Sequence, residues 1–216
     1  MVLPRAFFPV SGYIGDLSCP VNLTMYPPPL FLASTSPRRR ELLEQVGLLF
    51  SVLRVDVDES VREGERPADY VLRLAHEKAQ AGLAQVTAGV VIAADTSVVV
   101  GDAVLGKPAS EAEAVEMWLR LSGRTHQVLT GVVVSDGRHV DAVMVSTRVH
   151  FRAISREEMH AYWLTGEPRD KAGGYAIQGR AAVFVDAIEG SYSNVVGLPL
   201  TETASLLTRF GIRVLG

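Results

Sequence analysis

Hydrophobic and polar positions follow two different periods along the chain from Leu30 onward. Short apolar or alternating runs, typical of strands, are interleaved with longer runs in which apolar residues recur about every three or four positions, as they do in helices. The mixed order predicts an α/β fold built on a mixed, twisted sheet. The strand-like runs are 30–33, 50–57, 90–94, 97–100 and 212–215, with a long hairpin of 127–134 and 138–149.

Helix start and stop signals bound the segments between these strands. Prolines, serines and one serine–glutamate capping box mark the starts, and glycines mark several of the ends. The second helix carries a narrow stripe of mainly small residues at helical spacing. The predicted helices begin at Pro37, Pro67, Ser110, the capping box of Ser155 and Glu158, and Pro199, and the last runs to Phe210 with Gly211 as its stop.

A short polar turn followed by three consecutive arginines lies where the first strand gives way to the first helix. The free N–H groups and positive dipole end of that helix would lie beside the hydroxyls of Ser34 and Ser36. The guanidinium groups of Arg38 and Arg39 follow at once, so a phosphate group is a suitable ligand. The alternative is a helix capped by Ser36 whose basic first turn is solvated. These residues alone leave both interpretations open.

Two carboxylates follow predicted strands. Glu59 belongs to an acidic turn that closes strand 50–57, and Asp95 follows the apolar strand 90–94. A carboxylate in such a place either caps a turn or lies in a cleft, where metal ligands and general bases are found.

Two lysines are candidates for contact with an anionic ligand. Lys78 falls in the apolar stripe of the second helix, where a lysine usually extends its ammonium group to water but can also reach an anion in a cleft. Lys107 follows a tight turn at 101–102 that returns the chain toward Asp95. Because a proline follows Lys107 and restricts its loop, we expect its ammonium group near a polyphosphate rather than in solvent.

The segment 165–179 is too long and too mixed in charge to serve only as a connection. Its glycines permit close approach of the backbone to a ligand. Tyr175 offers a flat face, and the amide of Gln178 can pair with the edge of a base. We interpret this segment as a binding loop.

The composition excludes several classes of protein. The chain has 216 residues and a net charge of -3, without long runs of like charge, which argues against nonspecific binding to nucleic acid or to membrane surfaces. Cys19 is the only cysteine, so neither an intramolecular disulfide nor a cysteine-rich metal site is expected, and a reducing compartment, the cytoplasm, is favoured. No apolar run approaches the roughly 20 residues that span a bilayer.

Residues 1–29 show neither helical nor alternating periodicity, and they contain several prolines and glycines. We expect a poorly ordered extension there, with the folded domain at 30–216. Arg5 precedes a short apolar patch, but prolines and a glycine interrupt it before a signal peptide can form. Met25 lies just before the first convincing strand and is an alternative start of the chain.

Six short segments occur along the chain in an order that is itself informative, because each alone would be a weak signal. With them the chain resembles the Maf family of nucleoside triphosphate pyrophosphatases, from about Leu30 to the C-terminus. The segments are Ser-Thr-Ser-Pro-Arg-Arg at 34–39, Ala-Asp-Thr at 94–96, Gly-Lys-Pro at 106–108, Gly-Glu-Pro at 166–168, Asp-Lys-Ala-Gly at 170–173 and Val-Gly-Leu-Pro at 196–199.

The resemblance implies both a fold and an activity. The fold would be similar to that of the inosine-triphosphate pyrophosphatases, with two lobes around a cleft. The reaction would be hydrolysis of a nucleoside triphosphate to the monophosphate and pyrophosphate. Residues 170–179 look like the subgroup that acts on dTTP and UTP, whereas members acting on 7-methyl-GTP carry an acidic residue at the position of Gln178.

The resemblance also implies roles for individual residues. Asp95 would accept a proton, with Glu59 and Lys107 completing the catalytic group, and Glu59 and Asp95 would hold Mg²⁺ or Mn²⁺. Since a carboxylate that ligates a metal is a poorer base, the proton acceptor and the metal ligand can be two descriptions of one metal-bound water. The cations Arg38, Arg39, Lys78 and Lys107 would neutralise the triphosphate, and Arg38, Thr96 and Gln178 match positions that tune substrate choice.

Two other functions compete with dTTP and UTP hydrolysis. One is a nucleotide-binding regulator of cell division without turnover, but such a protein has no need of Glu59, Asp95 and Lys107 together. The other is a pyrophosphatase for modified purine triphosphates. Neither nucleic acid nor a membrane is expected as a partner, and a homodimer is compatible with these features.

A chain that begins at Met25 should keep the activity and the melting temperature of the full chain. The reason is that the deleted residues lack hydrophobic periodicity and precede the resemblance. Thermal unfolding and size-exclusion chromatography of the two chains measure this. A clear drop in melting temperature or in dimer content would show that Phe7, Phe8 or Tyr13 packs on the folded domain.

Overall fold

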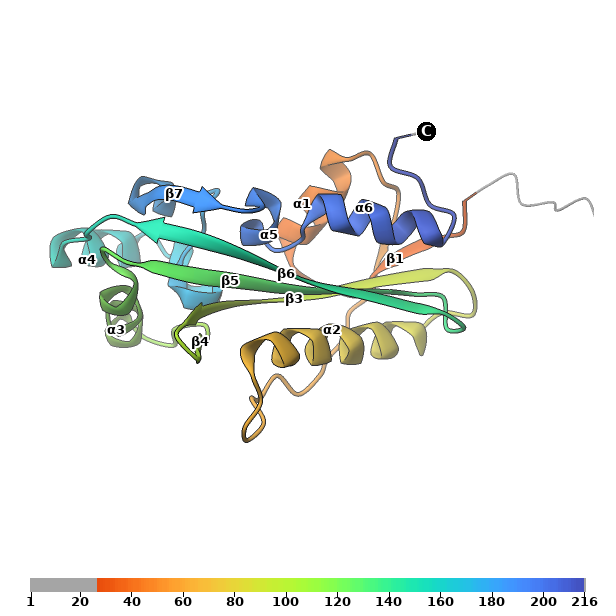
Figure 1. Cartoon of the computed structure of the whole chain (residues 1–216), viewed down its shortest axis with the longest axis horizontal. Coiled ribbons are helices and arrows are strands. Elements are labelled where there is room, and N and C mark those ends of the chain that lie inside the picture. Colours follow the sequence, from red (N-terminus) through yellow and green to blue (C-terminus); the bar gives the residue numbers. More distant parts are fainter. Residues whose placement is uncertain (1–26, 216) are drawn as a thin grey trace, which may run out of the picture.

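The computed structural model describes residues 27–215. The extension predicted for residues 1–29 therefore falls almost wholly outside the described residues, as do Cys19 and Met25. The described chain forms one mixed sheet with helices on both faces (Figure 1). This confirms the predicted mixed α/β class, while the likeness to inosine-triphosphate pyrophosphatases stays a prediction.

The sheet has seven strands in the order β2-β1-β3-β5-β6-β7, with β4 paired to β3. The β1 strand is parallel to β2 and β3, whereas all other pairs are antiparallel. The strands are β1 (Leu30–Leu32), β2 (Ser51–Val52), β3 (Val90–Val100), β4 (Ala103–Leu105), β5 (Thr125–Ser135), β6 (Val140–Phe151) and β7 (Val185–Glu189).

Helix α2 covers one face of the sheet, and α1, α5 and α6 cover the other, while α3 and α4 lie at one end (Figure 1). The three long strands β3, β5 and β6 cross the whole molecule, so the two expected lobes share one continuous sheet. The helices are α1 (Pro37–Gln45), α2 (Pro67–Leu83), α3 (Glu111–Leu121), α4 (Arg156–Leu164), α5 (Tyr192–Val196) and α6 (Leu200–Arg209), with 3₁₀ turns η1 (Glu167–Asp170), η2 (Ala172–Gly174) and η3 (Arg180–Phe184).

Small residues bring α2 unusually close to the sheet. The predicted stripe is buried, and a Cβ added to Gly82 would lie 2.9 Å from Ala33 Cβ. On the sheet side, a Cβ added to Gly131 would lie 2.6 Å from the carbonyl oxygen of Val71. Gly131 is the cross-strand partner of Asp95. This close approach therefore sets α2 directly over the centre of β3.

One edge of β3 is interrupted, and the interruption positions the candidate site. The β1 strand pairs with β3 only at residues 90–92, and β4 pairs with it only at 98–100. Between them, residues 93–97 pair with β5 on one side and with no described strand on the other. Side chains from both faces of β3 can therefore reach the same opening.

Three sequence expectations about strands were wrong. Residues 90–94 and 97–100 form one continuous strand, so Asp95 lies inside β3 rather than at a strand end. The expected strand at 50–57 is reduced to Ser51–Val52, because only those residues reach the short β1. Residues 212–215 form no strand; Ile212 is buried in the core beside α6 instead.

The helix boundaries were predicted more closely than the strands. The α1 and α2 helices start at the expected prolines, and α4 has the predicted capping box of Ser155 and Glu158. Ser36 lies at the N-cap of α1, but its side chain makes no capping hydrogen bond; instead its N–H donates to Ser34 Oγ at 3.2 Å. The expected cap is thus replaced by a turn that Ser34 closes.

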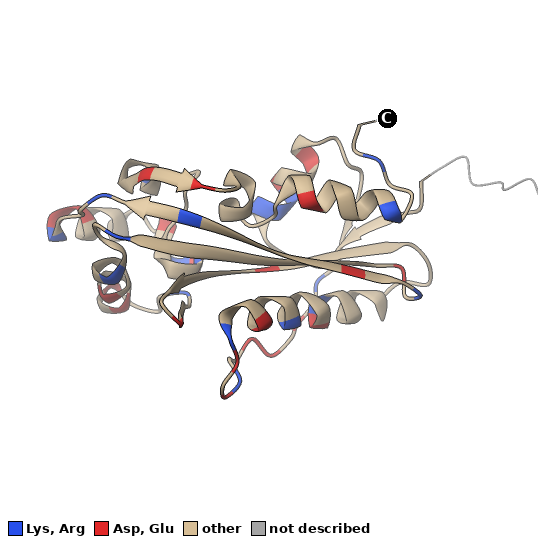
Figure 2. Cartoon of the chain, viewed as in Figure 1, with Lys and Arg blue, Asp and Glu red and all other residues tan. Residues whose placement is uncertain are grey.

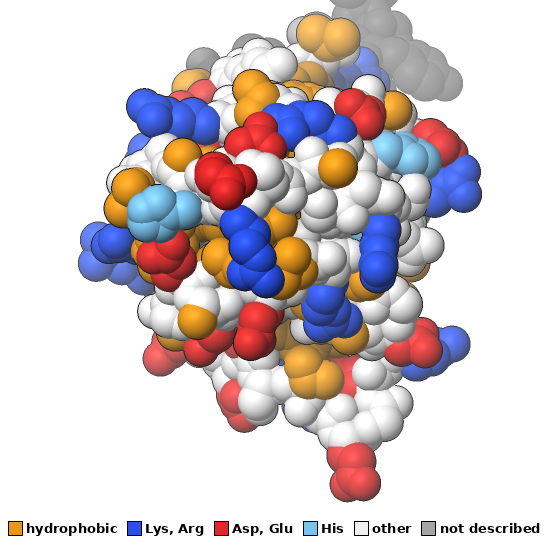
Figure 3. All heavy atoms as spheres, turned by 90° about the vertical axis from the view of Figure 1, so that its left-hand side faces the viewer, with side chains coloured by type: hydrophobic (Ala, Val, Ile, Leu, Met, Phe, Trp, Pro, Cys, Tyr) orange, Lys and Arg blue, Asp and Glu red, His pale blue; other side chains and the backbone are white. Residues whose placement is uncertain are grey.

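Acidic and basic residues are interspersed along the chain, and both kinds occur on the loop that precedes α2 and along that helix (Figure 2). At the end of the molecule that carries α3 and α4, exposed apolar side chains are separated by charged ones (Figure 3). Within residues 27–215, none of the helices has the length and apolarity needed to cross a membrane.

The ion pair of Arg73 and Glu65, which ties the loop before α2 to that helix, should make stability depend on acid pH. Hydrogen bonds from Arg73 lower the pKa of Glu65 to about 2 from its ordinary 4.5. A lowered folded-state pKa stabilises the fold above pH 4.5, and that contribution is lost as the pH falls from 4.5 toward 2. Near neutral pH we expect it to reach about 1 kcal/mol.

Urea unfolding of the wild type and of Glu65→Gln across this pH range measures the effect. The two free energies of unfolding should differ near neutrality and converge toward pH 2. Glu63→Gln is the matched control, because Glu63 is exposed and has no ion pair in the described chain. A constant difference between wild type and Glu65→Gln at all pH values would contradict the assignment.

Candidate active site

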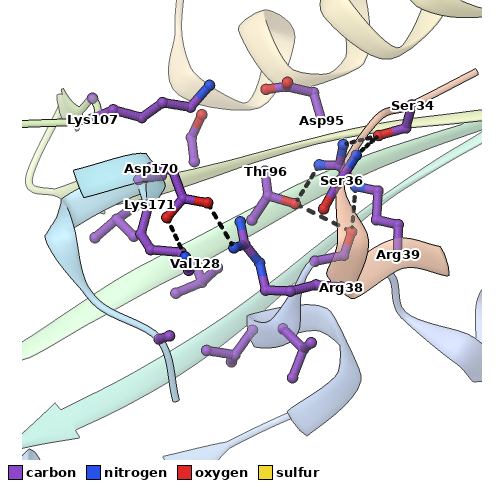
Figure 4. A pocket seen from close by; sticks show the side chains of 18 of the residues that line it. Ser34, Ser36, Arg38, Arg39, Asp95, Thr96, Lys107, Val128, Asp170 and Lys171 are labelled. Atoms are coloured by element: carbon purple, nitrogen blue, oxygen red, sulfur yellow. Dashed lines mark hydrogen bonds and ion pairs between the residues drawn. The ribbon is translucent and has the colours of Figure 1, made fainter. Parts of the chain in front are cut away.

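A cavity of about 510 Å³ lies at the interrupted edge of β3. Its volume is in the range of small-molecule sites. It is lined by the start of α1, the loop before α2, the centre of β3, the loop after β4 and the segment after η1 (Figure 4). All ten residues proposed from the sequence lie along it: Ser34, Ser36, Arg38, Arg39, Glu59, Lys78, Asp95, Thr96, Lys107 and Gln178.

Arg39 is buried and holds together three separate segments. Its Nε donates to the carbonyl of Gly197 at 2.9 Å, Nη1 donates to Ser34 Oγ at 3.1 Å and Nη2 donates to Thr96 Oγ1 at 3.1 Å. All three acceptors are neutral, and in the part of the chain that the structure describes no carboxylate forms an ion pair with Arg39. A buried charge that only neutral groups solvate is a good partner for an anion.

Burial lowers the pKa of Arg39, and the nearby Asp95 carboxylate offsets part of that effect. The guanidinium group nevertheless stays charged, as arginine does throughout proteins. The site therefore contains a permanent positive charge deep in the cavity wall.

Arg38 lies at the mouth of the same cavity, one residue earlier in α1. Its Nη1 is 3.8 Å from Asp170 Oδ2, and Asp170 also accepts a hydrogen bond from Lys171 (Figure 4). Burial lowers the pKa of Arg38, and Asp170 partly opposes this. Asp170 thus links the end of η1 to the first turn of α1 across the opening.

Lys78 joins the two proposed catalytic carboxylates. Its Nζ is 2.6 Å from Glu59 Oε1 and 2.7 Å from Asp95 Oδ1. The preferred expectation that Lys78 extends to water was wrong, because α2 packs too close to the sheet and the nearest polar groups are these carboxylates. The side chain instead turns toward the cavity, which was the second possibility. The alternative that Asp95 caps a turn is excluded by its place inside β3.

Helix α2 also holds the loop that carries Glu59. Tyr70 Oη donates to the Glu59 carbonyl at 2.8 Å, and Arg73 Nη2 donates to the carbonyl of Ser60 at 3.0 Å. Burial raises the pKa of Glu59, but the hydrogen bond and charge of Lys78 outweigh it, so the net shift is downward. Lys107 is exposed and lies beside Glu59, at 3.8 Å, rather than beside Asp95 as the hairpin suggested.

The donor set suits a hard divalent cation only together with further oxygen ligands. No group of three or more His, Cys, Asp and Glu side chains within residues 27–215 is arranged to hold a metal. Glu59 and Asp95 supply two carboxylates, and Asp95 Oδ2 has no hydrogen-bond partner in the same range. Mg²⁺ commonly takes one or two carboxylates and completes its shell with water and substrate phosphates. The two residues therefore fit a metal that is shared with a phosphate ligand.

The segment 165–179 lines the cavity only in part. Gln178 is exposed at the cavity, as expected of a residue that contacts a base. Tyr175 does not offer a free flat face: its ring packs edge-on against His126 and Phe151, and its hydroxyl lies 2.7 Å from His126 Nε2. Tyr175 therefore anchors the loop in the core, because its ring is more favourably buried than exposed.

The sequence profile described as Maf-like protein matches residues 29–210. The chain belongs to this family. The match covers every described helix and strand, from β1 to α6, and it begins just before the first strand of the structure.

Relatives with a named activity cover nearly the same span. A protein of Myxococcus xanthus named dTTP/UTP pyrophosphatase is 53% identical over 183 residues, which are 85% of this chain and 93% of that protein. A protein of Alkalilimnicola ehrlichii with the same name is 51% identical over 193 residues, 87% of this chain and 95% of its own length. In Acinetobacter baylyi a further protein of that name is 49% identical over 178 residues, 82% of this chain and 97% of that protein.

Several residues of the site were not singled out from the sequence. Asp170 and Lys171 belong to a recognised segment, but nothing in it indicated contact with Arg38. The Gly197 carbonyl and the Tyr70 hydroxyl act from distant parts of the chain. Asp170, Lys171 and Gly197 lie within recognised segments, which were the only signal that could have pointed to them, and Tyr70 had none.

Proposed function

We propose that the protein hydrolyses dTTP and UTP to the nucleoside monophosphate and pyrophosphate. The observation that carries the proposal is the arrangement of charge around one cavity. The hydrogen bonds of the buried Arg39 all go to neutral acceptors. The linked group of Glu59, Lys78 and Asp95 lies at the same open edge of β3, on the opposite face of the strand. The relatives named dTTP/UTP pyrophosphatase support the substrate.

Each part of the cavity has a task in this reaction. Arg38, Arg39 and the start of α1 hold the phosphates, since guanidinium groups and helix N-termini both bind them. Asp95 Oδ2 accepts a proton from the water that attacks the α-phosphorus. The bond between the α-phosphorus and the bridging oxygen breaks, and pyrophosphate leaves with the electron pair. Lys78 and Lys107 offset the charge that develops on it.

A divalent cation, Mg²⁺ or Mn²⁺, would be held by Glu59 and Asp95 together with the substrate phosphates, and it would neutralise phosphate charge as a Lewis acid. In the structure the Lys78 ammonium group lies between the same carboxylates. We therefore infer that Lys78 keeps the two acids together before the nucleotide binds.

The single cysteine of the chain and the nucleotide substrate favour a cytoplasmic location.

Pyrophosphate release from a panel of pyrimidine, purine and modified purine triphosphates, with Mg²⁺ or Mn²⁺, tests the proposal. The highest efficiency should be seen with dTTP and UTP. If kcat/KM is highest with a modified purine triphosphate, that nucleotide and not dTTP or UTP is the substrate. Binding of nucleotides without pyrophosphate release would instead support a regulator.

Asp95→Asn should keep the fold and lose about 10²–10⁴-fold in turnover, which is the usual contribution of a general base. The fold should persist because Lys78 keeps Glu59 as an ionic partner. Steady-state kinetics and circular dichroism measure the two effects, and Asp102→Asn in the exposed β3–β4 turn is the matched control. A variant that retained a tenth of wild-type turnover would refute the role of Asp95.

Gln178→Glu should weaken the use of dTTP and UTP by roughly tenfold to a hundredfold in kcat/KM. An amide can donate to O4 and accept from N3–H of these bases, whereas a carboxylate only accepts. The control is Gln80→Glu, on the exposed side of α2. Equal efficiency of wild type and Gln178→Glu on all pyrimidine triphosphates would show that Gln178 does not read the base.

A further inference from the structure

The Gly-Glu-Pro segment at 166–168 lies behind the cavity wall that carries Gln178. Gly166 adopts a left-handed conformation, with φ of 75°, just after α4, and Pro168 is buried in the 3₁₀ turn that follows. Between them, Glu167 directs its side chain at the segment 176–180. Glu167 is not among the residues that line the cavity. Any influence it has on a ligand must therefore pass through that segment.

The carboxylate of Glu167 accepts two hydrogen bonds. Tyr162 Oη donates to Oε1 at 2.7 Å, and the Arg180 N–H donates to Oε2 at 3.0 Å. The Tyr162 hydroxyl in turn accepts from the Ala176 N–H at 3.2 Å. Burial, followed by the Glu167 carboxylate, raises the pKa of Tyr162, so the hydroxyl keeps the proton that it donates. A continuous path of hydrogen bonds thus fixes the backbone on both sides of Gln178.

Glu167 also packs directly on the backbone of this turn at Gly179. A Cβ at this position would lie 2.5 Å from Cδ and from both carboxylate oxygens of Glu167, so the side chain lies directly against the Gly179 backbone. The Gly179 N–H also donates to the Ala176 carbonyl at 3.0 Å, which closes a tight turn around Gln178. Neither end of this turn can move without breaking contact with Glu167 or Tyr162.

We propose that Glu167 is a positioning residue for substrate choice, which it exerts by holding the turn that presents Gln178 to the cavity. The proposal rests on the proposed function, in which Gln178 contacts the base. In this proposal the Gly-Glu-Pro segment supports the turn that carries Gln178 and does not itself contact the nucleotide. The α4 helix contributes through Tyr162, which is buried beside the same turn.

A double-mutant cycle between Glu167 and Gln178 tests the proposal. In the wild-type background, Glu167→Ala should lower kcat/KM for dTTP about tenfold, mainly through KM, because binding of the base is affected and not the proton transfer. In a Gln178→Ala background the same substitution should cost less than about twofold. Glu167→Gln should fall between, since its NH₂ group replaces one of the two carboxylate oxygens and cannot accept the hydrogen bond made there.

Glu158→Ala is the matched control. Glu158 lies in the first turn of α4 and accepts hydrogen bonds from the Ser155 N–H and from Arg152. It does not contact the turn around Gln178. It should change kcat/KM by the same factor in both backgrounds. Equal losses from Glu167→Ala in the two backgrounds would refute the positioning role.

Amide hydrogen exchange gives a readout that needs no substrate. The Arg180 amide should exchange slowly in the wild type and in Glu158→Ala, and clearly faster in Glu167→Ala. Unchanged exchange at Arg180 would refute the proposal even if dTTP hydrolysis is found, whereas faster exchange in a protein that does not hydrolyse dTTP would contradict only the proposed function. If Glu167→Ala does not fold, Tyr162→Phe replaces it, since it removes only the shared hydroxyl and should show the same coupling to Gln178.

Discussion

The interruption of β3's edge is the constraint on which the rest of the site depends. Neighbouring residues of a strand point to opposite faces of a sheet, so the side chains of Asp95 and Thr96 would normally lie in different sites. Because β1 ends before them and β4 begins after them, the strand edge is open at this point. Asp95 reaches Lys78 on one face and Thr96 reaches Arg39 on the other, and both still line one cavity.

Close packing of α2 on the sheet directs a charged side chain into this opening. Glycines and alanines let α2 lie against the sheet, which leaves Lys78 too little room to reach solvent and directs it to the carboxylates. Across the strand, Arg39 is solvated by a carbonyl and two hydroxyls. Electrostatic interactions are stronger in such a poorly solvated place than in water. The cavity is therefore prepared for a ligand of high negative charge before the ligand arrives.

The short recognised segments divide into two kinds once they are seen in three dimensions. Residues 34–39, 94–96 and 106–108 place charged or hydroxyl side chains along the cavity. The segments 166–168 and 196–199 act from behind it: Glu167 holds the turn around Gln178, and the Gly197 carbonyl accepts from Arg39. The segment 170–173 does both, since Asp170 meets Arg38 while Gly173 donates to the Gly106 carbonyl at 2.9 Å.

The sequence alone determined the α/β class and the starts of α1, α2 and α4, because proline, capping boxes and apolar period act locally. It also named ten of the residues that line the cavity, since most of them belong to the short recognised segments. It did not determine that Asp95 lies within one long strand, since an acid in an apolar run is indistinguishable from a strand end until its partner is known. It also misjudged Lys78 and Tyr175, whose surroundings are made by residues far away in the chain. Burial and ionic partners are properties of packing, and only the tertiary structure decides them.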